Sequence, residues 1–388
     1  MIRDIYISGS IGYDEIMDFP GHFKDYFHPE KLHQINVSFA VARLNKHVGG
    51  IATNIAYAIA QLNDKSQITN NKSISNFKFQ ISNSKIHIYP VGAVGKDGQD
   101  VLDFFKKNKI STDHIQTIPE LYTTTGKVIT DMNDNQIWGY YYGASSKFAP
   151  KFKSQISNFN SNSANFKSQN KASDQRLSTN DFWVLSATHE KPFSAILRHC
   201  IANKLPYLFD PGMTLTWIRD DLLKKGVMNA TYLVGNDYEM AMIEKRLNMK
   251  VEEMVKKGVN VITTLGEKGV VYHGVDTMSS RPSRTRESKD KLNRLDGLSG
   301  TRIHSINTGQ KLLVTPFKVK KVVDPTGAGD AWRGGFVAGL AQGQPIETCL
   351  KLGNVMGSMA VEKVGTVAYT ATKEEVEKRL KKIKVITK

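Results

Sequence analysis

Cysteine is scarce in this chain, and long apolar runs are missing from it. The 388 residues include two cysteines, Cys200 and Cys349, whose spacing is neither that of a zinc site nor that of a redox pair. We therefore expect buried or idle thiols in a reducing compartment. No apolar run reaches the roughly 18 residues of a membrane span. The N-terminus carries Arg3 and Asp4 before only a short apolar run, so no signal peptide is expected. These absences predict a soluble, cytoplasmic protein that does not act at a membrane.

Acidic residues are outnumbered, with 37 Asp and Glu against 53 Lys and Arg and a net charge of +16. Such an excess can indicate a nucleic-acid partner. However, three polar stretches at 64–86, 151–180 and 276–309 hold 16 of the basic and 6 of the acidic residues, and so +10 of the net charge. Their composition is typical of low-complexity insertions that loops tolerate. We therefore do not expect nucleic acid to be a partner.

A phosphate-binding loop of the form Gly-x-x-x-x-Gly-Lys-Ser/Thr is also missing, which argues against a P-loop kinase. A different glycine-rich stretch stands at 322–336, with the sequence VVDPTGAGDAWRGGF. Pro325 cannot continue a strand, and Gly327 and Gly329 permit backbone angles that other residues resist. The stretch therefore predicts a short strand, a tight turn and a helix that begins at the glycines.

The predicted helix start has a chemical consequence. The first turn of a helix has unpaired N–H groups and a partial positive charge, so the amides of Gly327, Ala328 and Gly329 would attract an anion. Asp330 would repel a phosphate held there, so its position needs a reason. One reason is general-base work, in which Asp330 takes a proton from a hydroxyl that attacks the phosphate. An acidic helix cap beside a glycine-rich turn is the alternative.

Two further polar residues lie near the N-terminus. Residues 2–8 predict a first strand, and Asp14 follows in the turn that leaves its carboxyl end, where open α/β sheets bind ligands. Asp14 is either a cap or a carboxylate that binds a hydroxyl. The run 48–62, VGGIATNIAYAIAQL, predicts a buried helix with Asn54 in its first turn. Asn54 either satisfies local backbone or binds a sugar hydroxyl.

These motifs resemble those of the ribokinase-like (PfkB) family of carbohydrate and nucleoside kinases. The string Asp-Pro-Thr-Gly-Ala-Gly-Asp at 324–330 resembles the family's C-terminal signature, and Gly-Gly-x-x-x-Asn at 49–54 matches its N-terminal one. The resemblance implies a kinase that depends on ATP and Mg²⁺, with Asp330 as the base and the preceding amides as an anion hole. It also implies one domain over 1–388, an α/β fold with a three-layer α/β/α core, a mostly parallel central sheet and a small β-sheet lid.

Three stretches, 9–62, 136–144 and 185–189, resemble one group within this family in particular, the bacterial adenosine kinases. The residues that match those surrounding the ribose, together with the glycine at the adjoining turn, are Ser10, Asp14, Ser38, Gly49, Gly50 and Asn54. The expected reaction is the conversion of adenosine to AMP. A sugar kinase for ribose or a fructose-type substrate is the alternative within the family. A catalytically poor binder that recruits nucleic acid is a further alternative, against which the intact Asp330 argues.

The second half of the chain offers residues for the nucleotide. Asn236 and Glu239 resemble an Asn-x-x-Glu element that, in the family, touches ATP phosphates and the water shell of Mg²⁺. A capping box explains the same pair, and both explanations can hold. The spacing of Thr264, Gly266 and Gly269 fits a turn that contacts the nucleotide.

Two more assignments follow from the resemblance alone. Within a helix predicted at 346–361, Asn354 matches a position near one that faces the adenine of ATP, although a solvated helix asparagine is the alternative. Gly365 and Thr366 stand where relatives hold a monovalent cation such as K⁺. Among partners, a homodimer through the lid is a further expectation.

One stretch departs from the adenosine-kinase pattern. Met213 and Thr214 stand where some bacterial adenosine kinases carry paired glutamines that contact adenine. Adenine edges need matched donors and acceptors, and methionine offers neither strongly. The identity of the acceptor is therefore open.

The remaining pattern predicts the core strands and the lid. The lid is expected from about 11–50 and 119–146, where it would exclude water that competes as phosphoryl acceptor. Its strands are expected near 11–19 and 35–40 and in a hairpin of 123–131 with 137–142. Core strands are expected at 86–91, 182–187, 206–210, 231–234 and 261–264, with a turn over 92–98 after the first of these.

Overall fold

The computed structural model of this chain describes residues 2–27, 36–63, 86–133, 135–152, 180–275 and 311–387. The three predicted insertions lie outside the described residues, except at Ile86, Lys151, Phe152 and Asn180.

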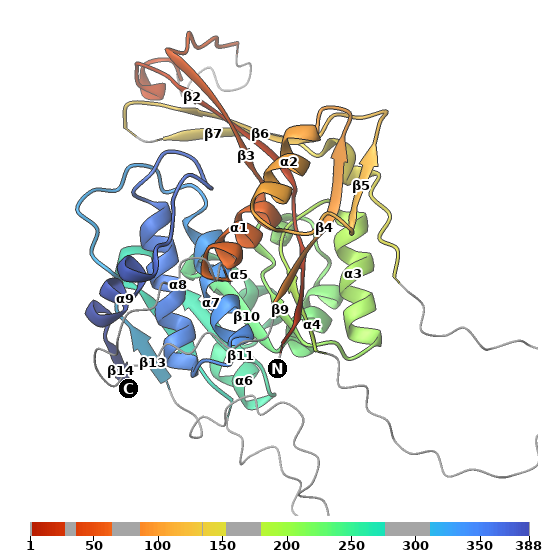
Figure 1. Cartoon of the computed structure of the whole chain (residues 1–388), viewed down its shortest axis with the longest axis vertical. Helices are drawn as coiled ribbons and strands as arrows, with labels where there is room; N and C mark the ends of the chain where they lie inside the picture. Colours follow the sequence, from red (N-terminus) through yellow and green to blue (C-terminus); the bar gives the residue numbers. More distant parts are fainter. Residues whose placement is uncertain are drawn as a thin grey trace, which may run out of the picture.

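A large mixed sheet forms the body of the molecule (Figure 1). Its strands are β1 (Asp4–Ser8), β4 (His87–Gly95), β5 (Ile115–Ile118), β8 (Asp181–Leu185), β9 (Tyr207–Phe209), β10 (Tyr232–Asn236), β11 (Asn260–Thr264), β12 (Val270–His273), β13 (Lys311–Val314) and β14 (Val385–Thr387). Their spatial order is β14-β13-β12-β11-β10-β9-β8-β1-β4-β5. Neighbours from β5 to β11 pair in parallel, and β12 to β14 extend the sheet antiparallel.

The strand sequences explain why both faces of this sheet are covered. In β8, Phe182 and Val184 belong to one hydrophobic core, whereas Trp183 and Leu185 belong to a second. Successive side chains of a strand point to opposite faces, so a strand that is apolar at both sets of positions must be buried on both sides. The prediction of a mostly parallel sheet between two helical layers is confirmed.

The helices divide between these two cores. The first core contains residues of α1 (Ile51–Asn63), α2 (Gln99–Lys107), α7 (Ala328–Ala341), α8 (Ile346–Ala360) and α9 (Lys373–Lys382). The second contains residues of α3 (Glu190–Ala202), α4 (Asp220–Met228), α5 (Asp237–Leu247) and α6 (Val251–Lys256). Four short 3₁₀ helices are also described: η1 (Phe23–Asp25), η4 (Gly143–Ser146), η5 (Gly212–Thr216) and η6 (Gly266–Lys268). None of the described helices is both long and apolar enough to cross a membrane.

Close packing of α7 depends on two glycines. A Cβ on Gly334 would lie 2.4 Å from the Cβ of Ala58 in α1, and one on Gly335 would lie 2.5 Å from the carbonyl oxygen of Leu352 in α8. Any larger residue at either position would push a neighbouring helix away. The glycines therefore let α1 and α8 approach α7 from two sides.

A separate sheet forms the lid above the body (Figure 1). It consists of β3 (Arg43–Gly49), β2 (Gly12–Asp18), β6 (Thr124–Thr130) and β7 (Gln136–Tyr141), in that spatial order. The predicted hairpin is confirmed, because β6 and β7 pair antiparallel. Only three residues link β1 to β2, so the lid begins where the first core strand ends.

One predicted lid strand is wrong. Residues 36–40 form no strand, and Arg43–Gly49 pairs with β2 in its place. The reason is aromatic packing, since the ring of Phe39 lies 4.9 Å from that of Phe19 and 5.1 Å from that of Phe23. An aromatic cluster at the lid tip thus holds a segment whose composition favours a strand.

Two other local predictions are also corrected. Val322 and Val323 form no strand and are 54% and 46% exposed, because the described sheet offers them no neighbouring strand. The turn predicted over 92–98 starts later, since β4 continues to Gly95 by pairing with β5. Tertiary pairing decides both outcomes.

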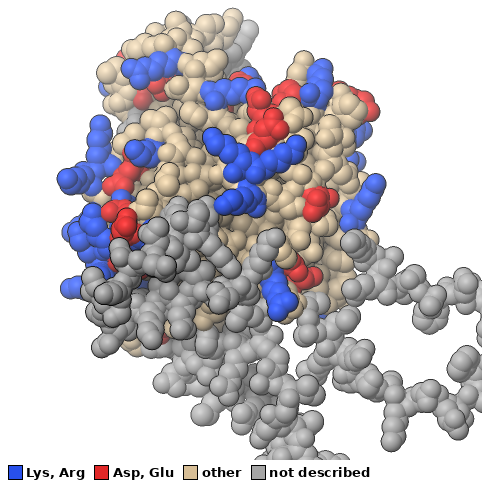
Figure 2. Space-filling model, in the orientation of Figure 1, with Lys and Arg blue, Asp and Glu red and all other residues tan. Residues whose placement is uncertain are grey.

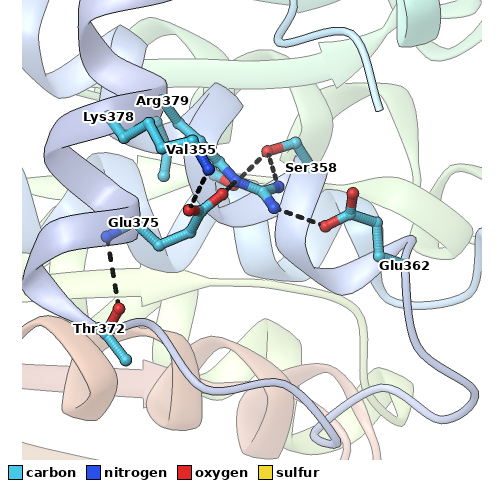
Figure 3. Close-up of polar contacts among 7 residues, drawn as sticks. All are labelled: Val355, Ser358, Glu362, Thr372, Glu375, Lys378 and Arg379. Carbon is cyan, nitrogen blue, oxygen red and sulfur yellow. Dashed lines mark hydrogen bonds and ion pairs between the residues drawn. The ribbon is translucent and has the colours of Figure 1, made fainter. Parts of the chain in front are cut away.

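Arginine anchors the C-terminal helix to the body (Figure 3). Arg379 of α9 is 8% exposed and donates from Nε to Glu375 at 2.8 Å, from Nη1 to Ser358 of α8 at 2.9 Å and from Nη2 to Glu362 at 2.6 Å. The neighbouring Lys378 makes an exposed ion pair with Glu375 at 2.9 Å. One guanidinium thus joins α9, α8 and the segment that follows α8.

This cluster predicts a large difference between two adjacent substitutions. We expect Arg379→Met to lower the free energy of unfolding by about 2 to 3 kcal/mol, somewhat less than for a fully buried pair because its carboxylate partners are partly exposed. Lys378→Met, which removes an exposed partner of the same Glu375, should lower it by less than about 1 kcal/mol. Urea denaturation of both variants measures the difference. Equal losses would show that Arg379 contributes no more than a surface ion pair.

Candidate active site

Polar side chains gather at the carboxyl ends of the central strands. Ser10 follows β1, Thr188 follows β8 and Asp210 follows β9. The carboxyl ends of parallel strands meet at one edge of the sheet, where such folds bind ligands. A cavity of about 210 Å³ lies between this edge and the lid, and it is lined by residues of both.

The start of α7 forms the floor of the site. Gly327 has a φ of +75° and caps the helix, which begins at Ala328. The side chain of Asp324 holds this turn, since Oδ1 accepts from the amide of Thr326 at 2.9 Å and Oδ2 from that of Gly365 at 3.0 Å. The predicted glycine turn at a helix N-terminus is confirmed, with the amides of the first turn at the edge of the cavity.

Asp330 lies in that first turn and is 15% exposed. Its Oδ2 accepts a hydrogen bond from Nδ2 of Asn54 at 2.8 Å, and Nη1 of Arg333 lies 3.9 Å from its Oδ1. Burial raises the pKa of Asp330 to about 7; Arg333 and Asn54 act against this rise, and Asp210 and Asp14 add to it. A carboxyl group whose pKa is near the working pH is well suited to accept a proton.

The first turn of α1 supplies the opposite wall. Ser10 Oγ accepts from the amide of Ile51 at 3.0 Å, and Asp14 accepts from the amide of Gly50. Burial raises the pKa of Asp14 to about 6, against the effect of the Gly50 amide and with a contribution from Asp324. The predicted Gly-Gly turn therefore orients the Asp14 carboxylate.

Glycine is required at both positions of that turn. Gly50 has a φ of +88°, and a Cβ on Gly49 would lie 2.0 Å from Oδ2 of Asp14. One wall residue also keeps a polar atom free: Oδ1 of Asn54 is buried without a hydrogen-bond partner among the described residues. This oxygen can accept a hydrogen bond from a ligand.

The lid contributes aromatic rings. Trp138, Tyr140 and Tyr142 line the cavity, and the rings of Trp138 and Tyr140 are stacked 5.4 Å apart at 7°. Residues two apart on a strand share one face, so the alternation in QIWGYYY at 136–142 was a usable signal for this wall. This stretch was predicted as a lid strand, without a role for its aromatic rings in the site.

Arg333 and Asp210 form an ion pair near the site that was not predicted from the sequence. Nη2 of Arg333 donates to Oδ1 of Asp210 at 2.6 Å, and both side chains are nearly buried. Arg333 is the one charged residue in the apolar run AWRGGFVAGLA at 331–341. A lone charge in such a run was the signal that could have drawn attention to it.

Five residues predicted for the nucleotide and its metal ion cluster at two neighbouring strands, and none of them lines the cavity. Asn236 caps α5, accepting from the amide of Glu239 at 2.7 Å, while Glu239 accepts from the amide of Asn236 at 2.8 Å. The capping box is therefore present, and Asn236 is paired in register with Thr264. Gly266 and Gly269 follow with φ values of +56° and +93°. All five residues stand at or just beyond the carboxyl ends of β10 and β11.

Two predicted site residues, and the pair that departs from the adenosine-kinase pattern, are placed differently from the rest. Ser38 is exposed and lies outside the cavity lining. Thr214 is fully buried and also outside the lining, whereas Met213 lines the cavity. Asn354 is buried, accepts from Nε1 of Trp332 at 2.8 Å and donates to the carbonyl of Thr315 at 2.8 Å. The alternative of a solvated helix asparagine is therefore wrong.

The donor set near Glu239 fits a magnesium ion. Burial raises the pKa of Glu239, and the charge of Asp210 adds to this rise. The backbone amide of Asn236 and the positive charge of Arg333 both act against it. A Cβ built on Gly212 would lie 3.9 Å from Oδ1 of Asp210 and 4.0 Å from Oε1 of Glu239, so the two carboxylates face one region. Within the described ranges, no group of three or more His, Cys, Asp or Glu could hold a metal ion. Mg²⁺ usually keeps several waters and takes phosphate ligands, which suits so small a set.

Comparison with known proteins agrees with this geometry. The model of the pfkB family carbohydrate kinases matches residues 21–290 and 296–373. A nucleoside kinase of Methanocaldococcus jannaschii is 24% identical over 367 residues, covering 93% of this chain and 95% of that protein. A ribokinase of Lactococcus lactis is 25% identical over 300 residues, covering 76% of this chain and 80% of the relative.

The fold has close counterparts among solved structures. A nucleoside kinase of Burkholderia thailandensis in complex with inosine matches with a TM-score of 0.67 at 22% identity, covering 97% of each chain. The predicted ribokinase-like fold is thus confirmed. With the family model matching most of its length, this chain belongs to the pfkB family of carbohydrate kinases and is an ATP-dependent phosphotransferase that acts on a hydroxyl group.

Proposed function

We propose that this protein is a nucleoside kinase, with adenosine as its leading acceptor and AMP as the product. The observation that carries the proposal is the contact between Asn54 and Asp330, which sets a carboxylate of raised pKa beside the glycine turn of α7. The nucleoside kinases among the relatives, and the inosine complex of the Burkholderia protein, support a nucleoside acceptor.

The acceptor would bind between the α1 wall and the lid. Asp14 and Oδ1 of Asn54 would accept hydrogen bonds from ribose hydroxyls, because both are buried acceptors that face the cavity. The stacked rings of Trp138 and Tyr140 offer a flat apolar surface to a base, and stacking on such rings tolerates different bases. Ser10, Gly49 and Gly50 would act by shaping the turn that presents Asp14.

Asp330 would act as the general base. It would take the proton from the attacking hydroxyl while that oxygen forms a bond to the γ-phosphorus and the bond to the β,γ-bridging oxygen breaks, leaving ADP. The amides of Gly327, Ala328 and Gly329 would hold the negative charge of the transferring group. The lid would exclude water from this transfer.

The nucleotide side of the site would use the second group of predicted residues. Bound ATP supplies the phosphoryl group, and Mg²⁺ neutralises its charge. Asn236, Thr264, Gly266 and Gly269 would contact the nucleotide, and Glu239 would hold Mg²⁺ through water. Asn354 would act by fixing the backbone at Thr315, since its amide group is already engaged there.

A monovalent cation would bind beside the glycine turn. Oγ1 of Thr366 is buried without a partner among the described residues. It lies next to Gly327, as a Cβ there would be 2.7 Å from Cγ2 of Thr366. A K⁺ ion at Gly365 and Thr366 would satisfy this oxygen.

A homodimer through the lid stays a prediction, supported by the unpaired outer edges of β3 and β7 in the described lid sheet. The expected lack of a nucleic-acid partner also stays a prediction. Figure 2 shows Lys and Arg side chains interspersed with Asp and Glu on one face of the described molecule, which favours that expectation.

A sugar kinase for ribose or a fructose-type substrate is the second candidate. Ribokinases are among the relatives. Asp14 and Asn54 could also bind the hydroxyl groups of a free sugar that carries no nucleobase. A screen of ATP consumption across nucleosides and free sugars decides between the two. Phosphorylation of ribose but of no nucleoside would overturn the proposed function.

Among nucleosides, we expect weak discrimination. Of Met213 and Thr214, only Met213 lines the cavity. An apolar contact of this kind distinguishes related ligands by only about 1 to 3 kcal/mol. Inosine or guanosine should therefore be used within about 100-fold of adenosine in kcat/KM. Met213→Gln should sharpen the preference for adenosine, while Met213→Leu, which has no hydrogen-bonding group, should not. A wild-type enzyme that uses adenosine alone would contradict this expectation.

Replacing the base gives a second expectation. Asp330→Asn should lower kcat by about 10²- to 10⁴-fold, the usual contribution of a general base, and leave Mg-ADP binding nearly unchanged. Turnover close to that of the wild type would show that another group takes the proton.

The same substitution should stabilise the fold at alkaline pH. The pKa of Asp330 is raised in the folded state, so the folded protein binds its proton more tightly than the unfolded chain does. This stabilisation is present at acidic pH and is lost as the pH rises through about 7. Because one pKa unit corresponds to about 1.4 kcal/mol, Asp330→Asn should raise the free energy of unfolding by about 1 to 3 kcal/mol at pH 8 and by much less near pH 4, the ordinary pKa of an unfolded aspartate. Urea denaturation at the two pH values tests the difference.

Catalysis should depend on pH in the opposite sense. The base must be ionised, so kcat/KM should rise as the pH increases through about 7 and then level off, with a fall approaching tenfold per unit on the acidic side. Initial rates at subsaturating acceptor measure this profile. A flat profile between about pH 6 and 8 would contradict the assignment of a raised pKa to the catalytic carboxyl.

A further inference from the structure

Arg333 lies one helical turn after the glycine turn of α7. Side chains on a helix lean toward its N-terminus, so residue i+4 covers residue i. Here Nη1 of Arg333 lies 2.7 Å from the point that a Cβ on Gly329 would occupy. The guanidinium therefore rests on the first turn of α7, beside the amides that form the anion site, and glycine at 329 leaves room for it.

The guanidinium is fixed along one edge only. Its Nη2 donates to Oδ1 of Asp210 at 2.6 Å, and Oδ2 of Asp210 accepts from Oγ of Ser186 at 2.9 Å. Nε is buried and has no hydrogen-bond partner among the described residues. Nη1 is 3.9 Å from Oδ1 of Asp330, beyond hydrogen-bond distance. A guanidinium has five N–H donors, and within the described part of the chain only one contact of this one lies within hydrogen-bond distance.

Acidic groups surround this cation. Although burial alone would lower the pKa of Arg333, the carboxylates of Asp210, Asp330 and Glu239 raise it. The side chain thus stays charged while it is 11% exposed. It is a preorganised positive charge with spare donors beside the first turn of α7, the kind of group that can stabilise developing negative charge.

We propose that Arg333 is a catalytic residue that donates hydrogen bonds to the transferring phosphoryl group, and that Asp210 is its positioning residue. In the transfer, the acceptor oxygen bonds to the γ-phosphorus, its proton goes to Asp330, and the electron pair of the breaking bond goes to the β-phosphate of ADP. Arg333 undergoes no covalent change and stabilises the charge on the non-bridging oxygens. The proposal rests on the phosphotransfer activity and is independent of which hydroxyl compound is the acceptor.

The test separates this role from a structural ion pair. Removing Arg333 alone would leave Asp210 buried and unpaired, so Arg333→Met is combined with Asp210→Asn, and Asp210→Asn alone is the reference. We expect kcat of the double variant to fall by about 10²- to 10³-fold relative to the reference, the range seen when one preorganised donor is removed, while both variants unfold at similar urea concentrations. Arg333→Lys, combined with Asp210→Asn in place of Arg333→Met, should recover part of the lost kcat. A double variant within about threefold of the reference would overturn the proposal.

A pH profile separates direct contact from an effect on the base. Arg333 lowers the pKa of Asp330, opposed by burial and by Asp210 and Asp14. If Arg333 acted only in this way, raising the pH to about 9 would ionise Asp330 and restore kcat of the double variant to the reference value. We expect the loss to persist at that pH. Full recovery of kcat at that pH would contradict a direct contact between Arg333 and the phosphoryl group.

A binding measurement needs no acceptor. Aluminium fluoride with Mg-ADP mimics the transferring phosphoryl group, and such mimics bind more tightly than the ground state. By calorimetry, the reference variant should bind Mg-ADP more tightly when aluminium fluoride is present, and the double variant should lose that gain while keeping its affinity for Mg-ADP. An equal gain in both variants would overturn the proposal. If the wild type phosphorylates no nucleoside, the proposed function fails, and this measurement still decides the role of Arg333.

Discussion

The hydrogen bond between Asn54 and Asp330 joins residues 276 positions apart, and the site depends on it. It requires the first turns of α1 and α7 to start side by side. Gly334 allows this closeness by admitting Ala58 of α1 against the backbone of α7. A larger residue in place of this glycine would push α1 away from α7, and would thereby also move the two halves of the site apart. The two sequence motifs therefore form one structural unit rather than two independent sites.

Burial of two carboxyl groups is the main cost of this arrangement. Burial raises the pKa of Asp14 to about 6 and that of Asp330 to about 7, so at neutral pH both carboxyl groups are held in surroundings that disfavour their charge. Arg333 offsets part of this cost at Asp330, and a bound hydroxyl compound and a metal ion would offset more. Ionising these carboxyl groups for catalysis therefore costs folding stability, which is the usual conflict between stability and activity.

Local sequence predicted the parts of the fold that local chemistry decides. The glycine turn at 327–329, the capping box at Asn236 and the hairpin of β6 with β7 need only neighbouring residues, and all three are present. Tertiary contacts decided the rest. Val322 is exposed because no described strand pairs with it, and Asn354 is buried because Trp332 and Thr315 satisfy its amide group. Such partners lie tens of residues away, so no local pattern revealed them.

Asp14 and Asp330 belong to different parts of the molecule. Asp14 lies on β2 of the lid, and Asp330 lies on α7 of the body, yet the charge of Asp14 contributes to the raised pKa of Asp330. Coulombic interactions weaken with distance and strengthen as water is excluded. Any change in the separation of lid and body therefore changes the basicity of Asp330. A substrate hydroxyl that donates to Asp14 would weaken the influence of Asp14 on the base, so binding of the acceptor and ionisation of the base are coupled through the lid strand itself.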